Sequence, residues 1–270
     1  MIFQIRRKGP CGSGARTAPA ALVCLLFAGG CAEPKQGPVV FYLDGAGWYS
    51  SADSVKQGLR DAGYEGEFST FSWSAYLGPA HDHFVNASSK GIARRLAGRI
   101  EKARRDDPGG RITVMGLSAG TVVVLGALEV LPQGVQVDDV VLLSSSASSQ
   151  HDLTRAMGRV RRNLYATCSP HDGILGGMVI NADGKPGPPA GRVGFRMPRK
   201  RDDKTKAAYD RVINLQWRPT YLAFDWDGGH TSVTNRKLVA SVIAPRLFSE
   251  EPFPLDRSVT DRVAARNSGG

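Results

Sequence analysis

The feature that most constrains this sequence is a five-residue turn, Gly116-Leu117-Ser118-Ala119-Gly120, between two apolar segments. The segment before it, 112–117, is short and apolar, as expected of a strand buried on both faces. The segment after it, 119–131, is apolar almost all round and predicts a buried helix. Glycine two residues to either side of Ser118 relieves crowding in a tight turn, because glycine has no Cβ. The pattern therefore predicts a serine exposed after a strand and at the positive N-terminus of a helix.

Strand and helix patterns alternate along most of the chain. We expect strands at 39–43, 68–73, 112–117, 137–143, 163–168 and 217–224, and helices at 51–62, 86–105, 119–131, 153–158 and 233–248. A polar serine-rich loop is expected at 144–149 and a long loop from Gly173 to about Lys206. Alternation of this kind predicts a mostly parallel sheet of about six strands with helices on both faces. Active sites in such sheets lie at the carboxyl ends of the strands.

A nucleophilic serine needs a base, and the base needs an acid that orients it. Of the five histidines, His230 lies after the last predicted strand and before the last predicted helix, in Asp227-Gly228-Gly229-His230-Thr231. The two glycines allow this loop to reach toward the serine. His230 is therefore the candidate base.

Asp172 is the preferred acid, because it lies in the loop that follows the fifth predicted strand, in Cys168-Ser169-Pro170-His171-Asp172-Gly173. Asp225 and Asp227 compete with it, but they are only five and three residues from His230, which makes the far side of its ring awkward to reach. Asp152 follows the fourth strand more loosely.

Ser118, Asp172 and His230, with the glycine-containing loop at 44–47, resemble the α/β-hydrolase family over about residues 39–248. The resemblance implies an acyl-enzyme mechanism without cofactor. Ser118 attacks an acyl carbonyl, His230 moves the proton and Asp172 holds the imidazolium. The expected activity is hydrolysis of a carboxylic ester, as in esterases and lipases.

The resemblance also implies an oxyanion hole made of two backbone N–H groups. One donor is expected at Ala119, which follows the nucleophile. The other is expected in the loop Asp44-Gly45-Ala46-Gly47-Trp48, with Ala46 preferred and Gly45 or Gly47 as alternatives. Gly45, Gly47, Trp48 and Leu117 are candidate substrate contacts.

Two departures from the family make the expected fold a reduced one. The first antiparallel strands are missing and no large helical cap domain follows. An open site of this kind favours accessible or polymeric esters. Two alternatives stay open: a thioesterase, amidase or peptidase of the same fold, and a non-catalytic envelope lipoprotein that uses the scaffold for binding.

The N-terminus predicts export. Basic residues precede an apolar run at 18–28, which is too short to span a bilayer, and Ala28-Gly29-Gly30-Cys31 resembles a bacterial lipobox. We expect a signal peptide at 1–30, a lipid on Cys31 that anchors the protein in the cell envelope, a tether at 31–38 and a disordered tail at 249–270. The alternative is a periplasmic or secreted protein without lipid.

Neither the charge pattern nor the spacing of possible metal ligands indicates a further binding partner. The formal net charge of +10 does not by itself indicate a nucleic-acid partner, because the basic residues are scattered. His81-Asp82-His83 lacks the geometry of a closed metal site. We therefore expect no metal and no nucleic acid.

Overall fold

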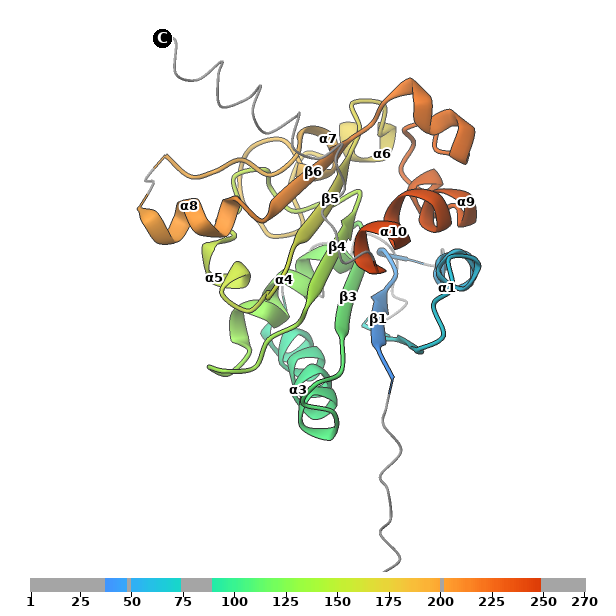
Figure 1. Cartoon of the computed structure of the whole chain (residues 1–270). Helices are drawn as coiled ribbons and strands as arrows, with labels where there is room; N and C mark the ends of the chain where they lie inside the picture. Colours follow the sequence, from blue (N-terminus) through green and yellow to red (C-terminus); the bar gives the residue numbers. More distant parts are fainter. Residues whose placement is uncertain (1–36, 48–49, 74–88, 200–201, 249–270) are drawn as a thin grey trace, which may run out of the picture. The chain divides into compact units, whose positions relative to one another are not determined.

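The computed structural model describes residues 37–47, 50–73, 89–199 and 202–248 (Figure 1). Six strands form one sheet in the order β2-β1-β3-β4-β5-β6, and every adjacent pair is parallel. The strands are β1 (Val39–Leu43), β2 (Glu67–Thr70), β3 (Ile112–Leu117), β4 (Asp139–Leu143), β5 (Leu164–Cys168) and β6 (Val212–Gln216). The predicted six-stranded α/β architecture is confirmed.

Burial on both faces explains why the four inner strands, β1, β3, β4 and β5, read as largely apolar runs. Neighbouring residues of a strand point to opposite faces. Phe41 of β1 and Val114 of β3 are partners in register and share one apolar cluster, whereas Tyr42 and Met115 belong to the cluster on the other face.

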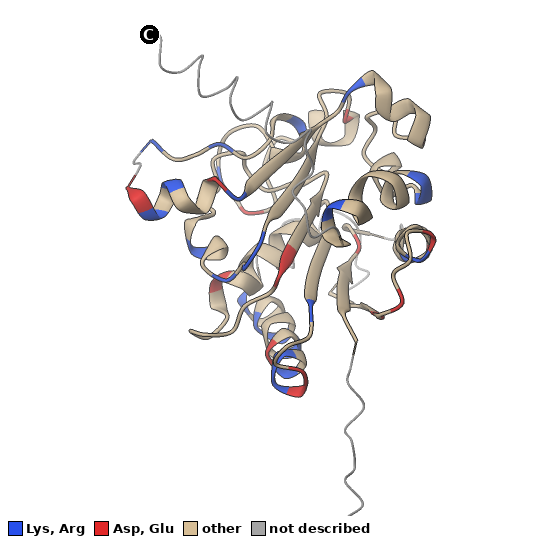
Figure 2. Ribbon diagram, in the orientation of Figure 1, with Lys and Arg blue, Asp and Glu red and all other residues tan. Residues whose placement is uncertain are grey.

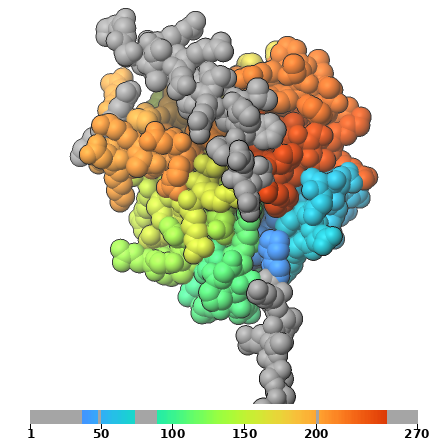
Figure 3. Space-filling model, in the orientation of Figure 1, coloured from blue at the N-terminus to red at the C-terminus, as the bar shows by residue number. Residues whose placement is uncertain are grey.

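Helices cover both faces of the sheet (Figure 1). One face carries α3 (Lys90–Asp106), α4 (Gly120–Val130), α5 (Thr154–Met157) and α8 (Asp203–Tyr209), and the other carries α1 (Ala52–Asp61), α9 (Arg236–Leu238) and α10 (Ala244–Phe248). Figure 3 shows α1, in cyan, beside the red closing helices that it contacts. Charged residues gather along α3 and α8, whereas most of the sheet carries none (Figure 2).

The sixth strand is not where the sequence pattern predicts it. Residues 212–216 form β6, which pairs with β5, and the predicted strand at 217–224 is mostly a 3₁₀ helix, η2 (Pro219–Phe224). Pro219 has no N–H to donate to a ladder, and Tyr221 instead stacks on Trp226 with ring centroids 5.2 Å apart.

Two further predictions need correction. The long loop after β5 contains α6 (Gly173–Gly176), α7 (Ala190–Val193) and α8, each too short to show a helical period. The single closing helix predicted at 233–248 begins with a 3₁₀ turn, η3 (Ser232–Thr234), and passes from α9 through a π-helical segment, η4 (Val239–Ile243), into α10.

Several predictions fall outside the described residues. They are the signal peptide, Cys31 and most of the tether within 1–36, the tail at 249–270, Trp48, and the His81-Asp82-His83 sequence.

A buried ionic cluster fastens the long connection after β5 to the rest of the domain. His151 Nδ1 lies 2.8 Å from Asp183 Oδ2, and its Nε2 lies 3.0 Å from Glu129 Oε1. Lys185 Nζ is 3.1 Å from the same Nδ1. Burial lowers the pKa of His151, but the two carboxylates outweigh burial and the net shift is upward. Burial raises the pKa values of Asp183 and Glu129, and their hydrogen bonds to His151 turn both net shifts downward.

These directions predict the pH range in which the cluster stabilises the fold. Because the pKa of His151 is raised in the folded protein, its stabilising contribution is complete at pH values below its unfolded pKa of about 6.5. That contribution is lost as the pH rises through the folded pKa. Because the pKa values of the two carboxylates are lowered, their stabilising contribution is complete at pH values above their unfolded pKa of about 4. That contribution is lost as the pH falls through the folded pKa values. His151→Gln should therefore cost about 3 kcal/mol near pH 6, and less at alkaline pH.

Thermal unfolding of both proteins from acid to alkaline pH measures this difference. Arg105→Gln is the control, because its ion pair with Glu101 is exposed and contributes little. A Tm difference between wild type and His151→Gln that is the same at pH 6 and pH 9 would contradict the assignment.

Candidate active site

Ser118 lies in a turn that only small flanking residues permit. Its φ is 52°, a left-handed conformation that is uncommon outside glycine. A Cβ on Gly120 would lie 2.4 Å from the Asp44 carbonyl oxygen, and one on Gly116 would lie 3.1 Å from the Gly120 backbone. Gly120 is therefore required by the close approach of the β3–α4 turn to the loop after β1, and Gly116 relieves crowding within the turn itself.

A buried layer of hydroxyl groups supports this turn from the side of β4. Ser118 N–H donates to the Leu143 carbonyl at 2.9 Å, and Thr121 Oγ1 lies 2.8 Å from Ser145 Oγ. The serine-rich stretch 144–149 was expected to be a polar loop, but each of its serines is at most 2% exposed. The sequence alone does not reveal this support, because hydroxyl-rich segments resemble surface loops in composition.

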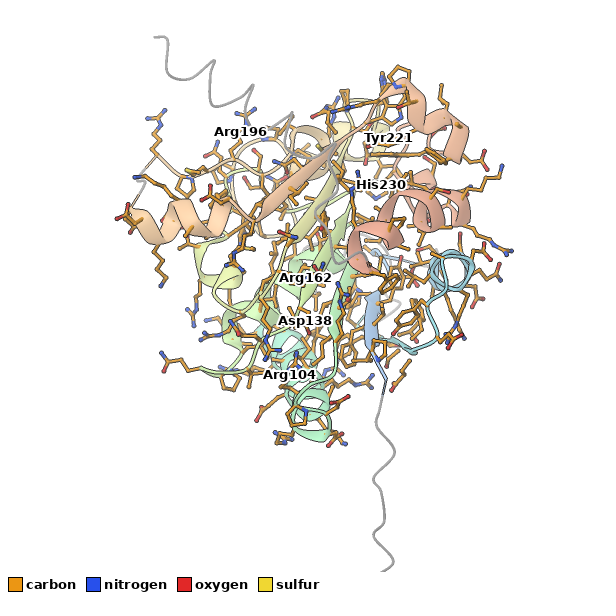
Figure 4. The ribbon with its side chains drawn as sticks, viewed as in Figure 1. Arg104, Asp138, Arg162, Arg196, Tyr221 and His230 are labelled. Atoms are coloured by element: carbon orange, nitrogen blue, oxygen red, sulfur yellow. The ribbon has the colours of Figure 1, made fainter. Side chains whose placement is uncertain are left out.

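Asp172 and His230 meet although they are 58 residues apart. His230 Nδ1 lies 2.8 Å from Asp172 Oδ2, and the carboxylate is fully buried. The other oxygen, Oδ1, accepts the Leu175 N–H at 2.9 Å, so that Asp172 also caps α6. Figure 4 shows His230 and Tyr221 toward the carboxyl end of the sheet, away from Arg104 and Asp138.

The competing carboxylates have other partners. Asp225 pairs with Lys237 Nζ at 2.9 Å. Asp227 accepts hydrogen bonds from Ser232 Oγ and from the Gly229 N–H, and the bond from Ser232 is the main reason for its lowered pKa. Asp152 accepts the Thr154 N–H at 2.9 Å. Asp172 is the carboxylate that orients the imidazole among the described residues.

Ser118 and His230 are both nearly buried, and each side chain has one polar atom without a partner among the described residues. Ser118 is 8% exposed, as is the His230 side chain. Within the described residues, no hydrogen bond joins Ser118 Oγ to the imidazole, and His230 Nε2 has no partner. Catalytic hydrogen bonds are often long before substrate binds and tighten in the complex.

Two backbone N–H groups near Ser118 have no acceptor among the described residues, those of Ala119 and Ala46. Ala119 opens α4, where unpaired N–H groups attract negative charge. The Ala46 loop lies against the turn, because a Cβ on Gly45 would be 3.2 Å from Ser118 Cβ.

Hydrogen bonds to Asp44 hold that loop in place. Asp44 Oδ1 accepts from both Ser51 N and Ser51 Oγ, and its carbonyl accepts the Trp73 indole N–H at 2.8 Å. Gly47 adopts a φ of 92°. The candidate contact Leu117 needs correction, since its side chain is 1% exposed and packs in the apolar cluster beneath α1.

No group of three or more His, Cys, Asp or Glu residues within the described ranges is arranged to hold a metal ion. None of the described helices combines the length and apolar character needed to cross a membrane.

Comparisons with known proteins identify the fold family. The model of a family described as alpha/beta hydrolase matches residues 49–176, which include the Ser118 turn and Asp172. The curated proteins give no match.

Solved structures include distant neighbours. An esterase from Pyrococcus furiosus is 13% identical with a TM-score of 0.41, and the alignment covers 76% of this chain and 84% of the esterase. A poly(3-hydroxybutyrate) depolymerase from Bordetella parapertussis is 11% identical with a TM-score of 0.45, covering 84% of each chain. A Trichoderma reesei cutinase is 13% identical with a TM-score of 0.36, covering 80% of each.

The family match stands beside an all-parallel six-stranded sheet and a serine held at positive φ between β3 and α4. Residues 49–176 match the α/β-hydrolase family, and the six-stranded parallel sheet is that of a reduced α/β-hydrolase fold.

Proposed function

We propose that the protein hydrolyses a carboxylic ester through a triad of Ser118, His230 and Asp172. The observation that carries the proposal is the 2.8 Å bond from His230 Nδ1 to Asp172, which leaves Nε2 as the ring nitrogen free to act as base. Ser118, in its turn at positive φ, is the nucleophile that this base serves.

The proposed reaction follows from these atoms. Ser118 Oγ attacks the acyl carbonyl while Nε2 of His230 takes its proton, and the N–H groups of Ala119 and Ala46 bind the oxyanion. The imidazolium then protonates the departing alcohol, leaving an acyl group on Ser118. Water, deprotonated by His230, releases the acid. The Asp172 carboxylate stabilises the imidazolium in both steps.

An ester is the first choice of substrate because an alcohol leaves more readily than an amine. A thioester is the nearest alternative substrate. An amide is a less favoured substrate, because its amine leaving group departs less readily than an alcohol. A binding scaffold without activity is the second candidate. This second candidate is supported by one observation: among the described residues, no hydrogen bond joins Ser118 to His230.

We also propose that the protein is exported and anchored in the cell envelope by a lipid on Cys31. The support comes from the sequence alone, namely the basic N-terminus, the short apolar run and the small residues before Cys31.

A fluorophosphonate probe tests for an activated serine. The purified wild-type protein should be labelled, and Ser118→Ala should not, because the probe reacts with serines whose hydroxyl is deprotonated by a neighbouring base. Ser149→Ala is the matched control and should be labelled like wild type, since Ser149 is a fully buried serine outside the turn. Failure of folded wild-type protein to react would favour the binding scaffold.

The choice of acid is tested by two matched substitutions. Asp172→Asn should lower kcat on an activated acetate ester by about a thousandfold or more, because the amide no longer favours the imidazolium. Asp225→Asn should stay within about threefold of wild type, since Asp225 is a surface residue at positive φ, which Asn tolerates. Equal losses in the two variants would overturn the assignment of Asp172.

Lipidation is tested by growing the producing bacterium with an alkyne-tagged fatty acid. Wild-type protein and Cys168→Ser should carry the tag and fractionate with membranes, and Cys31→Ser should do neither. Cys168 is buried at the end of β5 and serves as the control thiol. An untagged wild-type protein would indicate export without an anchor.

A further inference from the structure

Exposed apolar side chains are unevenly distributed over the protein. Six large hydrophobic residues are exposed among the described residues, and five of them follow β5 or β6: Ile174, Val179, Ile180, Val193 and Leu222. Val130, at the end of α4, is the sixth. Isolated exposed apolar residues are ordinary, but a group in two neighbouring segments marks a contact surface. We call these five residues the apolar rim.

The apolar rim is continuous in the chain with the candidate acid and base. Asp172 caps α6, and Ile174 is the second residue of that helix, with 59% of its surface exposed. Leu222 lies in η2, eight residues before His230. The two segments touch where the His171 and Trp217 rings meet edge to face, with centroids 4.4 Å apart. Figure 1 shows α6 and α7 at the end of the sheet where β5 finishes.

The segment that carries most of the apolar rim is firmly held on its inner side. The Ala182 N–H donates to the Ser146 carbonyl at 3.0 Å and the Gly191 N–H to the Ser145 carbonyl at 2.7 Å. Asp183 joins His151 in the ionic cluster. The inner apolar side chains of this segment, Leu175, Ala182, Ala190 and Phe195, are all buried.

Because the inner face is filled, the outward residues do not serve the packing of this segment. Val179 is 97% exposed although hydrogen bonds fix the backbone three residues farther on. A fixed backbone that displays apolar side chains binds an apolar ligand at little entropic cost. The position beside the acid loop indicates that this ligand is the part of the substrate next to the scissile bond.

We infer that the apolar rim binds the hydrocarbon chain of the substrate, so that the protein prefers esters of medium- to long-chain aliphatic acids over acetate. The inference rests on the proposed esterase function. Each methylene that the apolar rim covers should raise kcat/KM by about fourfold until the chain extends past it.

A series of nitrophenyl esters from acetate through butyrate and octanoate to decanoate tests this preference. We expect kcat/KM to rise from acetate to octanoate. In the double variant Ile174→Ser/Val179→Ser, the octanoate-to-acetate ratio of kcat/KM should fall by about tenfold. Val130→Ser also replaces an exposed apolar residue by serine, but outside the apolar rim. This control should leave the ratio at its wild-type value. A ratio that the double variant does not change overturns the inference.

A binding measurement separates failure of the apolar rim from failure of the esterase proposal. In the Ser118→Ala background, titration calorimetry with sodium decanoate reports chain binding without turnover. Decanoate binding that weakens with Ile174→Ser/Val179→Ser, and not with Val130→Ser, supports the apolar rim even if no ester is hydrolysed. Absence of decanoate binding, or binding that the double variant leaves unchanged, overturns it even if acetate esters are hydrolysed.

Discussion

The candidate site depends on one close approach between two backbone segments. The β3–α4 turn lies so near the loop after β1 that a side chain on Gly120 would overlap the Asp44 carbonyl. This contact brings Ser118 to the same end of the sheet as the N–H groups of Ala119 and Ala46, which have no acceptor among the described residues. Since Asp44 is itself held by Ser51 and Trp73, the loop cannot shift without breaking those hydrogen bonds. The backbone contact and the hydrogen bonds to Asp44 thus hold these N–H groups in place.

The second organising group is Asp172, whose two oxygens serve different parts of the molecule. One oxygen starts α6 and the other orients His230. The position of the base is therefore coupled to the segment that follows β5, and the cluster around His151 fixes the far part of the same segment. In this way the candidate base, the acid and the apolar rim share one support. A change that loosens the segment would affect both the proposed chemistry and the proposed binding of the substrate chain.

Much of this arrangement was predictable because parallel strands end at one edge of a sheet. Residues that follow different strands, such as Ser118 after β3 and Asp172 after β5, then lie close in space whatever their separation in sequence. The preference for Asp172 over Asp225 and Asp227 also agrees with the hydrogen bond to His230. The sixth strand was misplaced, because Asn214 interrupts its apolar pattern whereas the aromatic residues of 217–224 imitate a strand. Pairing with β5 decided between them.

The sequence by itself determined the alternation of strands and helices, the Ser118 turn and the candidate acid and base, because apolar periodicity and glycine positions are local properties of the chain. Only the tertiary structure decided that the serines at 144–149 are buried, that Leu117 belongs to the core, and that apolar side chains are exposed in two segments that touch after β5 and β6. Those outcomes depend on which surfaces meet. Burial is a property of pairs of segments distant in sequence, and composition alone does not specify the partner.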